Sequence, residues 1–139
     1  MPRPENGIRI RRKDWVAMQA HAASLMPEEV CGFVAGVRNR STAVFPVENI
    51  THRSDVFQME TKQQLEALMA LDDNGWELLA IYHSHPGGSF RPSELDYQGH
   101  YPECALLIWI PDLGGWSCRA YRIDENNEFA EISVMLLLK

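Results

Sequence analysis

The segment WELLAIYHSHPGG, residues 76–88, is the part of the chain that tells most about the fold. Residues 76–82 form an apolar run of strand length, and the Pro and Gly residues after His85 require a loop. His83 and His85 are two residues apart where the strand ends, and side chains with that spacing lie on the same side of a strand. The segment therefore predicts a buried strand with two imidazoles side by side at its end.

Strands and helices alternate around this segment. Apolar runs predict further strands at residues 30–37, 42–47, 104–110, 116–123 and 129–137, with a short one at 56–59. Helical spacing predicts helices at residues 13–26, 61–72 and 93–101. Helices interleaved with strands early and several strands late predict an α/β fold, a single-domain mixed β-sheet with flanking helices over residues 1–139.

The apolar residues of the two longer helices predict which face of each helix packs on the sheet. In the first helix these residues are Val16, Ala20, Ala23 and Leu25. In the second helix they are Leu65, Leu68, Met69 and Leu71. We expect both sets to point inward, because apolar residues at helical spacing form the buried stripe of a surface helix.

Composition and charge exclude several classes of protein. The formal net charge of −6 argues against broad binding to nucleic acid or to an anionic membrane, and the basic cluster at residues 9–13 is interpreted as a solvated segment. The longest apolar run, residues 104–110, is too short for a membrane span, and the first residues contain no apolar signal region. Three cysteines are too few for a disulfide framework. A cytoplasmic protein with neither a nucleic-acid nor a membrane partner is expected.

Two neutral imidazoles that converge on one point form half of a zinc site. Asp96 is the best candidate for the third ligand, because the Pro-Gly-Gly turn and the short helix after it bring this residue back toward the histidines. Two His, one carboxylate and one open position for water are typical of a hydrolytic zinc site. The sequence therefore predicts one zinc ion per chain, held by His83, His85 and Asp96.

Such a site also needs a base for the water and a donor for the developing oxyanion. Glu28 and Glu29 both stand at the start of the predicted strand at residues 30–37, and either could accept a proton from a zinc-bound water, whose pKa is about 7. The Ser93 hydroxyl, three residues before Asp96, is placed to donate to the oxyanion. The pair Ser93 and Asp96 also has the spacing of a helix capping box, which is the structural alternative.

These residues together resemble the JAMM (MPN+) metalloprotease signature. The matching positions are Glu29-Val30-Cys31-Gly32 after Pro27, then His83-x-His85-Pro86, and six residues later Ser93-x-x-Asp96. Phe57 with the helix after it, and Tyr101-Pro102, extend the resemblance over nearly the whole chain.

The resemblance implies a JAMM/MPN fold of the cytidine-deaminase-like type and hydrolysis of peptide or isopeptide bonds. It implies that His83, His85 and Asp96 are the zinc ligands, that Glu29 is the general acid/base and that Ser93 is the oxyanion donor. Glu29 is preferred to Glu28 because the glutamate of the family precedes one residue and then Cys/Met/Ala-Gly.

Short loops between the motifs, and no spare His/Cys cluster for a second metal, make the chain similar to the small stand-alone prokaryotic branch of this family. Members of that branch trim ubiquitin-like sulfur-carrier proteins. The resemblance thus implies cleavage after the C-terminal Gly-Gly of such a carrier, with release of cysteine or a short tail, in cysteine biosynthesis or other sulfur metabolism. The oligomeric state stays open, with a homodimer as one option.

Three other functions compete with this interpretation. A non-catalytic MPN-type binding module for a ubiquitin-like protein would not need the complete ligand set that this chain keeps. A RadC-like protein shares the His-x-His-Pro and Ser-x-x-Asp strings but has an additional N-terminal helical region. A zinc deaminase is excluded, because no Pro-Cys-x-x-Cys follows the histidines.

Two residues near the motifs have open roles. Cys31 shares a strand face with Glu29 and is expected to be a buried small apolar residue rather than part of the site. His100 lies four residues after Asp96, so it either orients that carboxylate or is a surface histidine.

Overall fold

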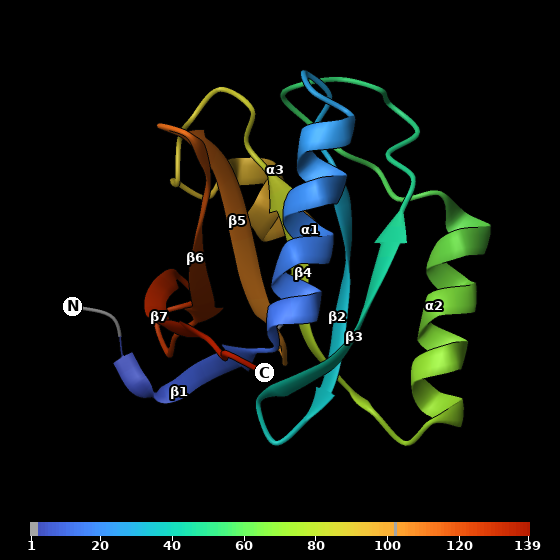
Figure 1. Cartoon of the computed structure of the whole chain (residues 1–139), viewed down its shortest axis with the longest axis vertical. Coiled ribbons are helices and arrows are strands. Elements are labelled where there is room, and N and C mark those ends of the chain that lie inside the picture. The colour runs from blue at the N-terminus through green and yellow to red at the C-terminus, as the bar shows by residue number, and fades with distance from the viewer. Residues whose placement is uncertain (1–2, 102) are drawn as a thin grey trace.

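Seven strands in residues 3–101 and 103–139, which the computed structural model describes, form one mixed sheet that closes into a barrel (Figure 1). Around the barrel the strands follow the order β1-β3-β2-β4-β5-β6-β7. Their bounds are β1 Arg3–Ile10, β2 Cys31–Val37, β3 Arg40–Val47, β4 Glu77–Ser84, β5 Ala105–Asp112, β6 Gly115–Ile123 and β7 Phe129–Leu136. The helices are α1 Arg12–Ser24, α2 Thr61–Asp73 and α3 Glu94–Gly99. The prediction of a mixed sheet with flanking helices is confirmed.

Strand β4 lies in the middle of the sheet and carries the first histidine. It pairs antiparallel with β2 and parallel with β5, and its residues from Leu79 to Ser84 are all buried. In these two ladders His83 lies opposite Cys31 on β2 and Ile108 on β5. The predicted buried strand is confirmed, and it extends far enough to include His83.

The two faces of the central strands pack against different helices. Val34 and Tyr82 belong to the core cluster that includes Met18 of α1. Phe33 and Ile81, their sequence neighbours, belong to the cluster that includes Ala67 of α2. Because successive strand residues point to opposite faces, His83 lies on the same face as Ile81. Figure 1 shows α1 in front of the sheet and α2 beside β3.

The buried face of α1 differs from the predicted one. Its buried residues are Asp14, Met18 and Ala22, whereas Val16 is 51% exposed and Leu25 is 41% exposed. The buried residues follow one another at intervals of four, so they form a single stripe on the helix. The prediction missed this stripe because it includes an acidic residue. Asp14 can be buried because it pairs with the Arg11 guanidinium at 2.8 Å and accepts the Ser41 hydroxyl at 2.6 Å.

The predicted face of α2 is correct only in part. Leu71 is buried together with Ala67, and Leu68 packs partly buried against the same cluster. Leu65 and Met69 are 58% and 56% exposed, and the prediction is wrong for both of them. Each lies two residues from one of the buried positions, which is about 200° around a helix and therefore on its outer side.

The N-terminal strand was missed by the sequence analysis. Residues Arg3–Ile10 form β1, which runs parallel to β7 and to β3. Ile8 and Ile10 are buried and Arg9 between them is exposed, so part of the basic cluster interpreted as a solvated segment lies in the sheet. Apolar and polar residues alternate only over Ile8–Ile10, which is too short to predict a strand beside so many basic residues.

Two predicted elements differ in the structure. Residues 56–59 do not form a strand, because their only ladder contact in the described chain is an isolated bridge between Met59 and Asn49. Helix α3 begins after Ser93 and ends at Gly99, so Tyr101 lies outside it. Pro102, which contributes to the family resemblance, falls outside the described residues.

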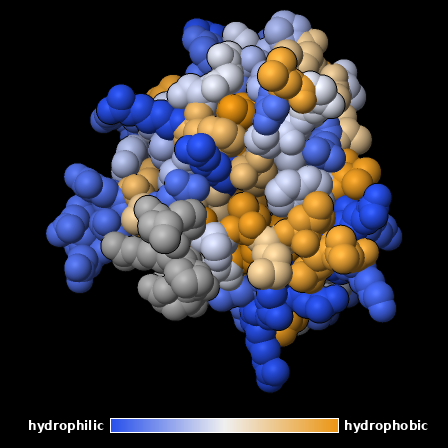
Figure 2. Space-filling view, turned by 60° about the vertical axis from the view of Figure 1, so that its left-hand side comes forward, coloured by the Kyte–Doolittle hydropathy of each residue, from blue (hydrophilic) through white to orange (hydrophobic). Residues whose placement is uncertain are grey.

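The surface mixes hydrophilic and apolar side chains. On the face drawn in Figure 2, apolar residues gather in the lower half and are bordered by hydrophilic ones. Large exposed apolar residues near the C-terminus are Met135, Leu136 and Leu138. None of the helices in the described part of the chain is both long and apolar enough to span a lipid bilayer.

Gly32 tests the tight packing between β2 and its neighbours. A Cβ atom added here would collide with the Tyr82 ring and with the Phe45 carbonyl oxygen, and neither group has room to move. We expect Gly32→Ala to lower the free energy of unfolding by about 1–3 kcal/mol, the usual range for overpacking. Gly115→Ala is the control, because a Cβ at that position meets open space. Denaturant titration of both variants measures the difference, and equal stabilities would contradict the proposed packing.

Candidate metal centre

Four titratable side chains from distant parts of the chain meet at one end of the sheet. They are Glu29, His83, His85 and Asp96, and one ligand atom from each lies within 4.8 Å of the others. His83 Nδ1 is 3.1 Å from Glu29 Oε1, and His83 Nε2 is 3.2 Å from Asp96 Oδ1. His85 Nε2 is 3.5 Å from Asp96 Oδ2. The structure thus brings together the three predicted ligands and one of the two candidate bases.

Hydrogen bonds of the loop after β4 hold the His85 ring toward this cluster. The backbone N–H of His85 donates to the Trp109 carbonyl at 2.8 Å, which continues the pairing of β4 with β5. Its Nδ1 lies 2.6 Å from the Ser89 carbonyl oxygen. A carbonyl can only accept, so Nδ1 carries the proton and Nε2 of the neutral ring has a free lone pair. Nε2 is the nitrogen that faces Asp96.

His83 is the most unusual member of the cluster. Its ring is completely buried, and neither ring nitrogen makes a hydrogen bond, although carboxylate oxygens are close to both. Phe57 covers the ring with a centroid distance of 4.9 Å. Buried polar atoms without a partner are rare and costly. A cation bound between His83 and Asp96 would give such a nitrogen a partner, so these residues fit a metal ion.

Asp96 forms the capping box at the start of α3 and also faces the histidines. Its Oδ2 accepts the Ser93 N–H at 2.7 Å, and its own N–H donates to Ser93 Oγ at 3.1 Å, which completes a capping box at the start of α3. Its Oδ1 faces His83. Burial alone would raise the pKa of Asp96, but the neighbouring imidazoles of His85 and His83 and the Ser93 N–H outweigh burial and lower the pKa.

The Ser93 hydroxyl can still donate a hydrogen bond, although its oxygen is used in the capping box. Its Oγ accepts from Asp96 and donates to no other described residue, and the side chain is exposed beside the cluster. The capping interpretation of the pair is therefore correct without preventing Ser93 from donating to a substrate oxygen.

The structure separates the two candidate bases. Glu29 is buried and faces His83, whereas the Glu28 carboxylate accepts from His52 Nδ1 at 2.7 Å and lies away from the cluster. The backbone of Glu29 is held on both sides, because its N–H donates to the Arg53 carbonyl at 2.7 Å and its carbonyl accepts the Asn49 side-chain amide at 2.8 Å.

Asn49 is a positioning residue that the sequence analysis missed. It is only 6% exposed, and its amide nitrogen also donates to the Val56 carbonyl while its oxygen accepts the Gln58 N–H. One side chain thereby joins Glu29 to the loop that carries Phe57. A single asparagine between Glu48 and Ile50 has no motif around it, so no pattern in the sequence could have indicated this role.

Cys31 and His100 both lie close to the cluster without entering it. Burial, with a smaller contribution from the charge of Glu29, raises the pKa of Cys31 to about 12, so the thiol stays protonated as expected for a buried residue. His100 is 9% exposed and its Nε2 lies 2.8 Å from the Cys104 carbonyl oxygen. It is therefore not a surface histidine, and it makes no hydrogen bond to Asp96 in the described structure.

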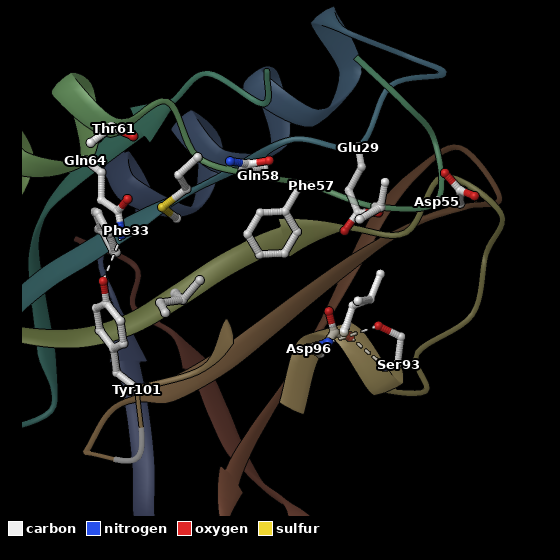
Figure 3. Close-up of a pocket in the computed structure, with 14 residues that line it drawn as sticks. Glu29, Phe33, Asp55, Phe57, Gln58, Thr61, Gln64, Ser93, Asp96 and Tyr101 are labelled. Carbon is white, nitrogen blue, oxygen red and sulfur yellow. Dashed lines mark hydrogen bonds between the residues drawn. The ribbon is translucent and has the colours of Figure 1, made fainter. Parts of the chain in front are cut away.

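Two pockets open beside the cluster. The first, of about 280 Å³, is mainly apolar, and Figure 3 shows Glu29, Asp96 and Ser93 at one end with Gln64 and Tyr101 at the other. The second pocket, of about 630 Å³, has a mixed lining that includes several charged side chains. Its lining includes His85, Ser89, Arg91, Glu94 and Tyr97. Glu29, Asp55 and Ser93 line both pockets, so a substrate that extends through both would pass directly over the cluster.

Comparison with curated proteins gives two informative relatives. A desampylase of Haloferax volcanii is 32% identical over 117 residues, which cover 81% of each chain. A CysO-cysteine peptidase of Mycobacterium tuberculosis is 30% identical over 125 residues, which cover 84% of this chain and 83% of the peptidase.

Comparison with solved structures gives the same fold. A protein from Desulfitobacterium hafniense has a TM-score of 0.78 at 28% identity, with coverage of 95% of this chain and 94% of that one. A JAB1/MPN domain protein from Archaeoglobus fulgidus has a TM-score of 0.53 at 20% identity, with coverage of 92% and 99%. The family model for prokaryotic homologues of the JAB domain matches residues 12–124. The chain therefore belongs to the prokaryotic JAB family and has the JAMM/MPN fold.

Proposed function

We propose that this chain is a zinc metallopeptidase that hydrolyses the peptide or isopeptide bond after the C-terminal Gly-Gly of a ubiquitin-like sulfur-carrier protein, with cysteine or a short tail as the leaving group. The buried His83, whose two nitrogens have no hydrogen-bond partner in a cluster with His85 and Asp96, is the observation that carries the proposal. The similarity to a desampylase and to a CysO-cysteine peptidase supports the class of substrate.

His83, His85 and Asp96 would hold one zinc ion per chain. Two imidazoles and one carboxylate are a common ligand set of catalytic zinc, and they leave a coordination position free. When bound, zinc would act as a Lewis acid toward the scissile carbonyl and make water a better nucleophile near neutral pH.

Glu29 would move the proton and Ser93 would stabilise charge. The Glu29 carboxylate is buried and lines both pockets, so it can take a proton from the attacking water and deliver it to the leaving nitrogen. The Ser93 hydroxyl is free to donate to the carbonyl oxygen as negative charge develops there.

Cys31, Cys104 and Cys118 are all free thiols, which suits the cytoplasmic location expected from the sequence.

Cleavage of a carrier tests the proposed function directly. Zinc-loaded protein is expected to trim a ubiquitin-like protein that extends beyond Gly-Gly, with about one zinc per chain, because one ligand set holds one ion. Intact-mass spectrometry of the carrier and elemental analysis of the enzyme are the measurements, before and after chelation. Activity that survives complete metal removal would contradict a metallopeptidase. Carrier binding without cleavage by the zinc-loaded protein would favour a non-catalytic binding module instead.

The two neighbouring glutamates give a matched test of the base. Glu29→Gln is expected to keep zinc and lower kcat at least about 100-fold, because the ligands remain and the proton acceptor is lost. Glu28→Gln is the control and should stay close to the unmodified protein, since its carboxylate faces His52 on the outer side. Equal losses in both variants, or none in Glu29→Gln, would remove Glu29 from this role.

Asp96 is expected to contribute to metal affinity as well as to the helix cap. Asp96→Asn should weaken zinc binding at least about 100-fold, because a neutral amide is a poorer ligand than a carboxylate. Ser93→Ala breaks the same capping box without removing a ligand, so it should keep its zinc. Competition with a metal-binding dye measures the affinity of both variants. Loss of zinc from Ser93→Ala alone would mean that the cap, and not the carboxylate, is what the site requires.

A further inference from the structure

We infer that Arg91 binds the α-carboxylate of the leaving group, so that the preferred substrate is a carrier with one free amino acid after its Gly-Gly. This inference rests on the proposed hydrolysis and assigns the second pocket, of about 630 Å³, to the leaving group. A Gly-Gly tail has no charged side chain, whereas a terminal amino acid brings a carboxylate into the site. The second pocket is lined by Arg91, whereas no Lys or Arg lines the first, so the second suits the charged half of such a substrate better.

The Arg91 guanidinium has no partner in the described chain. It makes no ion pair or side-chain hydrogen bond there, not even with Glu94 three residues later in the same pocket. Two further carboxylates line this pocket: Asp55 accepts from Arg53 through both oxygens at 2.9 and 2.8 Å, and Glu29 faces His83. Arg91 is therefore available to bind an anion that enters with the substrate.

The loop holds the Arg91 backbone in place beside Ser93. The Arg91 N–H donates to Ser89 Oγ at 3.1 Å, and the Ser89 carbonyl is in turn the partner of His85. The preceding residue is fixed as well, because the Phe90 carbonyl accepts the Tyr121 hydroxyl at 2.9 Å. Less conformational entropy is lost on binding when the segment that carries the recognising group is already ordered.

The chemistry of the substrate explains why this position would select a free amino acid. The α-carboxylate of a single leaving residue is two bonds from the scissile nitrogen, so a cation that recognises it must lie in the pocket next to the catalytic groups. A lysine joined through its side chain presents only methylene groups at that distance. A guanidinium binds a carboxylate through two parallel hydrogen bonds, which gives both affinity and orientation.

Three forms of one substrate test the inference. They are a ubiquitin-like protein ending in Gly-Gly-Ala with a free carboxylate, the same protein with a C-terminal amide, and its isopeptide conjugate to a lysine peptide. We expect kcat/KM of the zinc-loaded enzyme to be about tenfold higher for the free acid than for the amide, in the range of one hydrogen-bonded charge pair. Arg91→Gln should abolish this ratio and Arg91→Lys should restore part of it. Arg12→Gln, an exposed arginine of α1 outside both pockets, should leave it unchanged.

A binding measurement separates recognition from turnover. In the Glu29→Gln background, the free-acid form is expected to bind about tenfold more tightly than the amide by calorimetry, and the additional Arg91→Gln change should remove the difference. A preference for the free acid that persists in Arg91→Gln would overturn the inference, as would equal cleavage of all three forms, which would leave the proposed function standing. No cleavage of any form by the unmodified enzyme would overturn both.

Discussion

The register between β2 and β4 is the constraint on which the site depends. Cys31 lies opposite His83, and the pairing continues one residue further, because the Ser84 N–H donates to the Val30 carbonyl and the Val30 N–H donates to Ser84 Oγ. These bonds carry the chain directly into Glu29, which is why a residue 54 positions before His83 meets its ring. A slip of one residue would turn the inward side chains of one strand to the opposite face and separate the two groups. Gly32 protects the same register, since only a residue without Cβ fits between Tyr82 and the backbone of β3.

The ionisable groups of the cluster are largely buried, and the surrounding structure provides hydrogen-bond partners for most of the residues that form it. Asn49 binds the Glu29 carbonyl, the capping box satisfies Ser93 and Asp96, and the Ser89 carbonyl satisfies His85. The ring of His83 is the exception. Folding has therefore fixed the geometry of the donors in advance, so binding of a metal would require little reorganisation and would give a nitrogen of His83 a partner.

Much of this arrangement could be predicted, because its signals are local. Apolar runs predict β2 and β4, and the spacing of His83, His85 and Asp96 predicts that these three side chains meet. The helix faces were harder to predict, since Asp14 is buried only because Arg11 and Ser41 meet it, and these partners are fixed by tertiary structure. Residues that act through a single long-range hydrogen bond, as Asn49 does, leave no periodicity in the sequence. The same applies to Arg91, whose availability depends on every nearby carboxylate being paired elsewhere or out of reach.

The closure of the barrel through β1 has a mechanical consequence. Strand β1 pairs with β7 at four positions, but with β3 only where Arg9 meets Arg40. Beyond that pair, Arg11 after β1 joins β3, because its backbone N–H donates to Ser41 Oγ and its guanidinium donates to the Thr42 carbonyl. Under load or partial denaturation, the barrel should open along this line first and become an open sheet with β1 still attached to β7. The cluster of Glu29, His83, His85 and Asp96 lies at the ends of β2 and β4, away from that seam, so the barrel could open there while the cluster stays assembled.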